Sequence, residues 1–162
     1  MIKNKKILAI IAVIVLLLVG ALYWFKSQPN YRDDKKRISS QVDSEFSYKS
    51  IYVSEQGFGN DMANVCRFTL KNPKDIKGFV SVDKLNKKEK EDIDNFYNTD
   101  FNTEWEDNKN TGKYTHVINE LSALKSSSDT KYIHHRIENS SSYELYIYNK
   151  KMNVGYYVVS II

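Results

Sequence analysis

"SYELYIY" (142–148) decides the fold, together with "KYIHHRI" (131–137) before it and "VGYYVVSII" (154–162) after it. All three stretches are rich in the β-branched and aromatic residues that favour strands. Only short turn sequences separate them, and strands joined by short turns pair in antiparallel fashion. The sequence therefore predicts a three-stranded antiparallel meander in the last third of the chain.

Three further strands are expected earlier in the chain. The stretch "EFSYKSIYV" (45–53) alternates aromatic and polar residues, which is the period of a strand with two different faces. Turn sequences rich in Gly, Asn, Asp and Pro then separate it from apolar runs at 64–70 and 78–85. The third of these strands is expected to be short.

Two helices are predicted between the two groups of strands. Asn86 is followed three residues later by Glu89, a spacing typical of a capping box at the start of a helix over 87–98. A second helix over 115–125 places several apolar residues on one face. The order βββ-α-α-βββ predicts an α+β domain with a mainly antiparallel sheet and two or three helices.

The chain begins with a long apolar run, "ILAIIAVIVLLLVGALYWF" (7–25), which lies between Lys6 and Lys26. As a helix it would extend roughly 28 Å, close to the roughly 30 Å of a bilayer core. The run has no polar face, which argues against a helix packed in the core of a soluble domain. We interpret it as an N-terminal single transmembrane helix, a signal-anchor. A signal peptide cleaved after Ala21 is the alternative.

This interpretation sets the expected organisation and localisation. Residues 1–6 would be a cytoplasmic basic N-terminus, 7–25 the transmembrane helix, 26–44 a juxtamembrane stalk and 45–162 an extracytoplasmic α+β domain. The protein would then be a single-pass protein of the cell membrane, in contact with the lipid bilayer through residues 7–25.

The charge distribution argues against a nucleic-acid partner. Four of the 24 basic residues flank the apolar run, and the other 20 are balanced by the 20 Asp and Glu residues. A nucleic-acid-binding domain needs a concentrated basic face to displace counterions from phosphates. We therefore expect another protein, rather than nucleic acid, as the partner.

The cysteine, histidine and acidic residues, whose side chains can catalyse reactions or bind metals, form no recognisable catalytic or metal-binding motif. The single cysteine, Cys66, lies at strand spacing with apolar residues and is expected to be buried. His134 and His135 are adjacent on a strand, so they point to opposite faces and cannot share one metal ion there. The acidic stretch 89–107 lacks the glycine and the final glutamate of a calcium loop. No catalytic residue, metal or cofactor is predicted.

The tyrosines give the strongest functional indication. Tyr146 and Tyr148 share one face of a predicted strand, and Tyr is enriched at protein interfaces. With Tyr157 and the isolated Trp105 they are the predicted partner-binding residues. Ordinary cross-strand pairing of aromatic residues is the competing explanation.

These observations lead to one functional hypothesis and two alternatives. The hypothesis is a membrane-anchored extracytoplasmic binding module without catalysis, such as an immunity protein or an envelope-system accessory of a bacterium. The first alternative is an envelope hydrolase that uses His134 or His135 with an acid from 89–107. The second is a structural subunit of a membrane complex.

Overall fold

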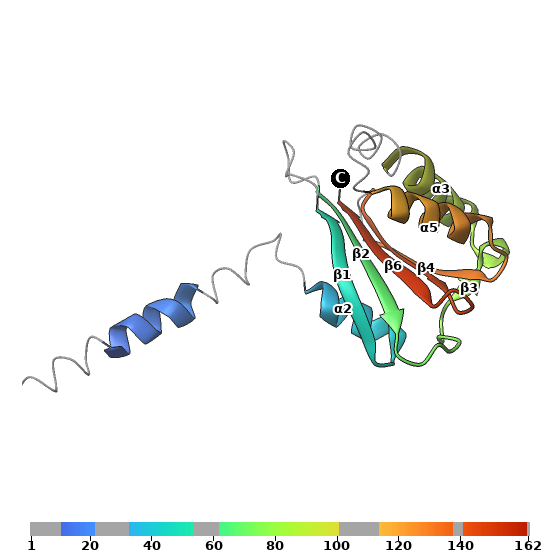
Figure 1. Cartoon of the computed structure of the whole chain (residues 1–162). Coiled ribbons are helices and arrows are strands. Elements are labelled where there is room, and N and C mark those ends of the chain that lie inside the picture. The colour runs from blue at the N-terminus through green and yellow to red at the C-terminus, as the bar shows by residue number, and fades with distance from the viewer. Residues whose placement is uncertain (1–10, 22–32, 54–61, 101–113, 138–140, 162) are drawn as a thin grey trace, which may run out of the picture. The chain divides into compact units, whose positions relative to one another are not determined.

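The sheet and its helices lie in one compact unit, Asp34–Ile162, and a second unit comprises Met1–Asp33. The computed structural model of the chain describes residues 11–21, 33–53, 62–100, 114–137 and 141–161. Figure 1 shows the larger unit as an α+β fold built around one six-stranded antiparallel sheet.

The sheet has the order β1-β2-β6-β5-β4-β3, and every neighbouring pair is antiparallel. Its strands are β1 (Phe46–Val53), β2 (Met62–Leu70), β3 (Val80–Ser81), β4 (Thr130–Arg136), β5 (Tyr143–Asn149) and β6 (Val154–Ile161). The predicted meander is the β4-β5-β6 part of this sheet. The strand predicted over 78–85 is reduced to two residues, because the turn η1 (Val82–Lys84) follows at once.

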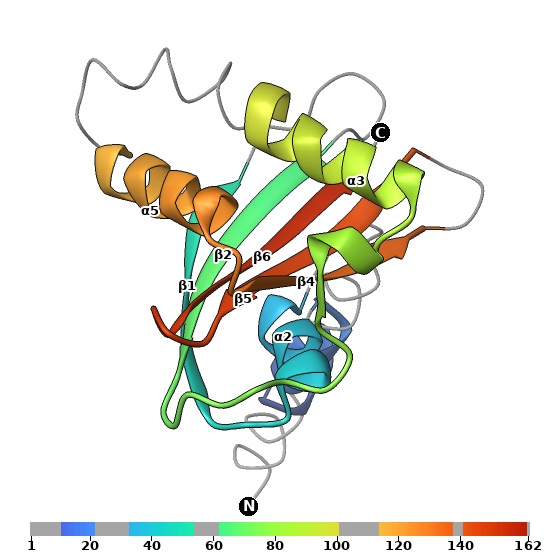
Figure 2. The same cartoon turned by 90° about the vertical axis from the view of Figure 1, so that its right-hand side faces the viewer.

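Helices cover both faces of the sheet (Figure 2). On one face lie α3 (Lys87–Asn95), which continues as the π-helical turn η2 (Phe96–Asp100), and α5 (Thr115–Ser126). On the other face lies α2 (Asp34–Val42). The predicted capping box starts α3: the Glu89 amide donates to the Asn86 side chain at 3.0 Å, and the Asn86 amide donates to the Glu89 carboxylate at 2.8 Å.

Side-chain alternation along the strands divides the interior into two cores. On β5, Leu145 and Ile147 pack under α3 and α5, whereas Tyr146 and Tyr148 pack under α2. All residues of β5 are buried, as are nearly all of β6. A strand buried on both faces requires a helical layer on each side, and this requirement determines the three-layer arrangement.

The structure of the N-terminal segment contradicts the prediction of a transmembrane helix. Residues 11–21 form a helix. Of the helices that the structure describes, none combines the length and the apolar character needed to cross a membrane. The prediction of a transmembrane signal-anchor over 7–25 is therefore wrong, as are the single-pass membrane localisation and the extracytoplasmic placement derived from it. Residues 1–10 and 22–25 lie outside the described residues.

The predicted stalk over 26–44 includes a helix that belongs to the main fold. Residues 34–42 form α2, and its Ile38 and Val42 are 0% and 1% exposed in the core beneath it. These two residues are four apart, so they fall on one face of a helix and pack together on the sheet. The remainder of α2 is polar; Asp34 and Arg37 contact the sheet, and most of the other residues are exposed.

Gly155 is required by the packing of β6 on β2. It lies opposite Phe68 in the register, and a Cβ added at Gly155 would overlap the Phe68 ring. We predict that Gly155→Ala lowers the free energy of unfolding by about 1–3 kcal/mol, because the buried ring cannot move aside without strain.

Urea denaturation followed by circular dichroism measures this effect. Gly155→Ala combined with Phe68→Leu should recover part of the loss, since the smaller side chain makes room for the methyl group. Gly20→Ala is the control, because nothing lies within 4 Å of its added Cβ. An unchanged stability of Gly155→Ala would contradict the packing described.

Candidate functional site

The predicted tyrosine surface is buried. Tyr146, Tyr148 and Tyr157 are 1%, 2% and 0% exposed, and the rings of Tyr146 and Tyr157 lie 4.7 Å apart in the core beneath α2. Since α2 covers them, these side chains do not reach a partner in this conformation. Trp105 lies outside the described residues.

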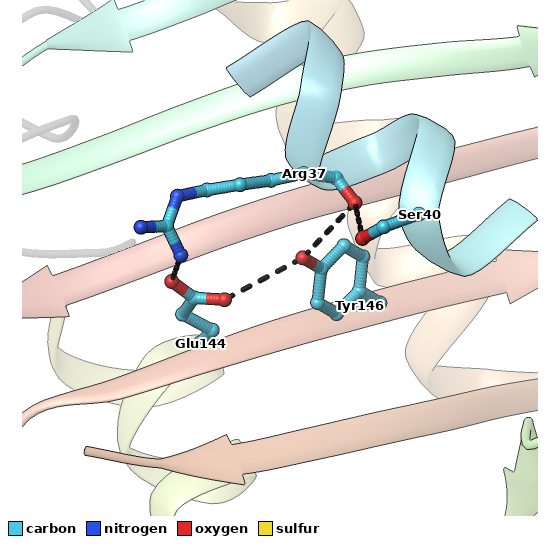
Figure 3. Close-up of polar contacts among 4 residues, drawn as sticks. All are labelled: Arg37, Ser40, Glu144 and Tyr146. Carbon is cyan, nitrogen blue, oxygen red and sulfur yellow. Dashed lines mark hydrogen bonds and ion pairs between the residues drawn. The ribbon is translucent and has the colours of Figure 1, made fainter. Parts of the chain in front are cut away.

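A polar contact ties α2 to the sheet above these tyrosines (Figure 3). Arg37 on α2 forms an ion pair with Glu144 on β5. The Tyr146 hydroxyl donates at 3.4 Å to the Arg37 carbonyl, which also accepts a hydrogen bond of 2.7 Å from Ser40. Burial raises the pKa of Tyr146, and the neighbouring Tyr157 and Glu144 raise it further. The phenol therefore remains protonated and keeps its role as a donor.

Cys66 lies in a second polar contact under α2. Asn64 donates a hydrogen bond of 2.7 Å to the Asp34 carboxylate, and the Cys66 sulfur lies 3.6 Å from the same oxygen. Burial raises the pKa of the Cys66 thiol to about 12, and the negative charge of Asp34 adds to the effect. Because the thiolate is the reactive form, the buried Cys66 thiol packs in the core and is expected to have low reactivity.

The histidines lie on opposite faces of β4, as their adjacency predicted. His135 meets the Tyr146 ring edge-on at 6.1 Å on the α2 side, and His134 stacks on Tyr143 at 5.5 Å on the other side. The His134 Nε2 lies 3.1 Å from an Asp92 oxygen of α3 without the alignment of a hydrogen bond. Burial lowers the pKa of His134, although Asp92 and Glu89 oppose the shift.

The His134–Asp92 pair is the combination that the hydrolase alternative requires. Its two side chains are only 3% and 9% exposed, so both are enclosed between α3 and the sheet. A general base must lie within hydrogen-bond reach of a proton on its substrate. In this conformation the pair instead connects a helix to a strand.

A third polar contact connects α5 to the sheet. Arg67 on β2 donates two hydrogen bonds, of 2.7 and 2.9 Å, to the Glu120 carboxylate, and the Tyr156 hydroxyl of β6 donates a third of 2.5 Å. Burial raises the pKa of Glu120, but the hydrogen bonds from Arg67 and Tyr156 outweigh it and hold the pKa below its usual value. Each of the three helices thus has a polar contact with the sheet that involves a carboxylate: Glu144 with α2, Asp92 of α3 and Glu120 of α5.

The rest of the acidic stretch that the structure describes is also engaged in local contacts. Glu91 pairs with Lys87 along α3, and Asp94 lies 3.9 Å from Lys125 of α5. Within the described residues, no group of three His, Cys, Asp or Glu side chains could hold a metal ion. Residues 101–107 of the stretch lie outside the described residues.

Among the described strands, β1 is one of the two edge strands of the sheet. In the described part of the chain β1 pairs with β2 alone. The Lys71 amide donates to the Glu45 carbonyl at 2.9 Å, so Glu45 turns its backbone groups toward β2. Leu70, opposite Phe46, instead bonds through its own N–H and C=O to Asn153 on its other side.

The direction of these bonds fixes which backbone groups face outward. Backbone groups alternate sides along a strand, so those of Phe46, Tyr48 and Ser50 point away from β2. We call this row the β1 edge. The β1 edge ends at a β-bulge between Ser50 and Tyr52. Tyr48, within this edge, is 42% exposed. The alternation of residues 45–53 predicted the strand but could not show that it would lie at the edge of the sheet.

Comparisons with known proteins do not assign this fold or this edge to a family. No family model matches the chain, and no match was found among curated proteins or solved structures.

His134 should make the stability depend on pH. The unfolded chain takes up a proton near pH 6.5, whereas the folded chain resists protonation because the pKa of His134 is lowered. We predict that the free energy of unfolding falls as the pH drops through 6.5, by at most about 1.4 kcal/mol per pH unit. Urea denaturation between about pH 7.5 and 5.5 measures the slope. His134→Gln should reduce the slope, and an unchanged slope in this variant would contradict the assignment.

Cys66 should be unreactive until the protein unfolds. Its pKa of about 12 leaves almost no thiolate at pH 8. We predict that a chromogenic disulfide reagent reacts on the order of 100-fold or more slowly with the folded protein than with the protein in urea. Ser122→Cys, at an exposed position of α5, is the control that should react in the folded state. Rapid reaction of native Cys66 would show that α2 does not stay in place.

Proposed function

We propose that this protein is a non-catalytic binding module that takes up an extended segment of a protein partner along the β1 edge. The observation that carries the proposal is the row of outward backbone groups at Phe46, Tyr48 and Ser50, which no described strand pairs. A strand added there would satisfy these groups, while side chains on the two faces would provide selectivity.

The two edges of the sheet differ in a way that favours β1. β3, at the opposite edge, has two residues, whereas β1 has eight. Very short edge strands prevent unwanted pairing. A strand long enough to pair, next to an exposed aromatic side chain, is therefore the better docking surface of the two.

The buried polar pairs support binding over catalysis. The His134–Asp92, Arg67–Glu120 and Arg37–Glu144 contacts each join a helix to the sheet, and this role accounts for the position of these polar side chains. The immunity-protein, envelope-accessory and envelope-hydrolase roles are not tested by the structure and stay predictions.

Photocrosslinking in cells tests the proposal. A benzophenone amino acid at Ser47, an exposed position of β1, should give one discrete product whose partner is identified by mass spectrometry. Tyr48→Pro in the same chain should reduce its yield at least about tenfold, because proline lacks the outward N–H yet is tolerated where that N–H faces solvent.

Two controls separate pairing from other causes. Tyr48→Thr keeps the outward N–H and removes the ring, so it should retain most of the product. The same crosslinker at Val82, which is 47% exposed in η1, should give none. If Tyr48→Pro and Tyr48→Thr gave equal yields while both variants remained folded, strand addition would be excluded.

A further inference from the structure

We propose that the partner strand is β1 of a second copy of this chain, paired in antiparallel fashion about a two-fold axis at Ser47. This inference rests on the proposed function, because it uses the same β1 edge. The two sheets would become one continuous sheet across the axis.

Hydrogen bonding limits the possible registers. Across two β1 edges, outward residues must face outward residues, since these carry the available N–H and C=O groups. A two-fold axis at Ser47 places Phe46 of each copy opposite Tyr48 of the other. Both residues have outward backbone groups, so each such pair can exchange two hydrogen bonds.

Charge selects this register from the others. With the axis at Ser47, Glu45 of each copy lies opposite Lys49 of the other, on the same face of the sheet. Glu45 pairs with Lys71 of its own copy at 2.7 Å in an exposed contact, its side chain being 74% exposed, and Lys49 is also exposed, so Lys49 of the second copy would add a second cation beside the Glu45 carboxylate. An axis at Tyr48 would place Ser47 opposite Lys49, and an axis at Lys49 would bring the two lysines together. Self-pairing is therefore complementary in one register and repulsive or neutral in its neighbours.

The aromatic residues are complementary in the same register. Phe46 and Tyr48 lie on the α2 side of the sheet, with ring centroids 6.2 Å apart within one copy. Pairing about Ser47 brings each ring next to the other aromatic residue of the second copy. Directly opposed aromatic residues are among the favourable cross-strand pairs, and the exposed ring of Tyr48 would become covered.

The rest of the edge limits the assembly to two copies. The bulge between Ser50 and Tyr52 interrupts a regular ladder, which confines pairing to the first part of β1. The opposite edge offers only Val80–Ser81. A two-fold contact uses the same surface on both copies and so closes at a dimer rather than extending into a fibre.

A disulfide at the axis tests the register. Ser47 would face itself in a non-hydrogen-bonded pair, where Cα atoms lie about 4.5 Å apart, within the range that a disulfide spans. The full-length chain with Ser47→Cys should therefore form a covalent dimer under mild oxidation. Lys49→Cys is the matched control, since the two cysteines would lie about 13 Å apart, and it should give at least about tenfold less. The unaltered chain, with buried Cys66 alone, should give none.

A charge exchange tests the contact between Glu45 and Lys49. In the Ser47→Cys chain, Glu45→Lys or Lys49→Glu should each reduce the covalent dimer several-fold, because like charges then face each other. A mixture of the two variants should restore it as a mixed dimer, since every lysine would again face a glutamate. Copies that carry tags of different mass identify the mixed product on a gel.

The outcomes distinguish this inference from the proposed function. Equal yields from Ser47→Cys and Lys49→Cys, or no recovery in the mixture, would overturn self-pairing. If self-pairing fails but crosslinking from Ser47 still captures another protein, and Tyr48→Pro abolishes it, the edge binds a different partner. If neither experiment gives a product, both proposals fail.

Discussion

The burial of β5 and β6 on both faces is the constraint on which the structure depends. Apolar or aromatic side chains project from these strands in both directions, so a single layer of helices would leave one face in water. α3 and α5 cover one face, and the short helix α2 covers the other. The position of α2 in turn encloses the tyrosines, while most of the described β1 residues stay exposed at the edge of the sheet.

The three ionic contacts between helices and sheet follow from the same constraint. Apolar contacts are non-directional, and a polar contact between each helix and the sheet adds a positional preference to them. Arg37, Arg67 and His134 each provide a cation or an imidazole to a carboxylate across such an interface. These residue types also occur as catalytic groups, and in this structure each of the three joins a helix to the sheet.

Local patterns in the sequence predicted most of the individual elements. The strand alternation of 45–53, the final meander and the Asn86–Glu89 capping box are each determined by residues close together in the chain. The errors arose where distant residues decide the outcome. The Ile38 and Val42 pair was visible, but nothing in the sequence indicated that α2 would pack on the tyrosines. The apolar run 7–25 satisfied a length rule, whereas none of the helices among the described residues has the length and apolar character to cross a membrane.

The position of α2 at the start of the main unit has a mechanical consequence. It follows Asp33 directly and, among the described contacts, is held by side chains rather than by a strand ladder. Tension applied through the preceding segment would therefore act on α2 before any strand. It would break the side-chain contacts of α2 one after another while the hydrogen-bonded sheet stayed folded. The tyrosines beneath would then be uncovered by force, in a molecule whose sheet remains intact.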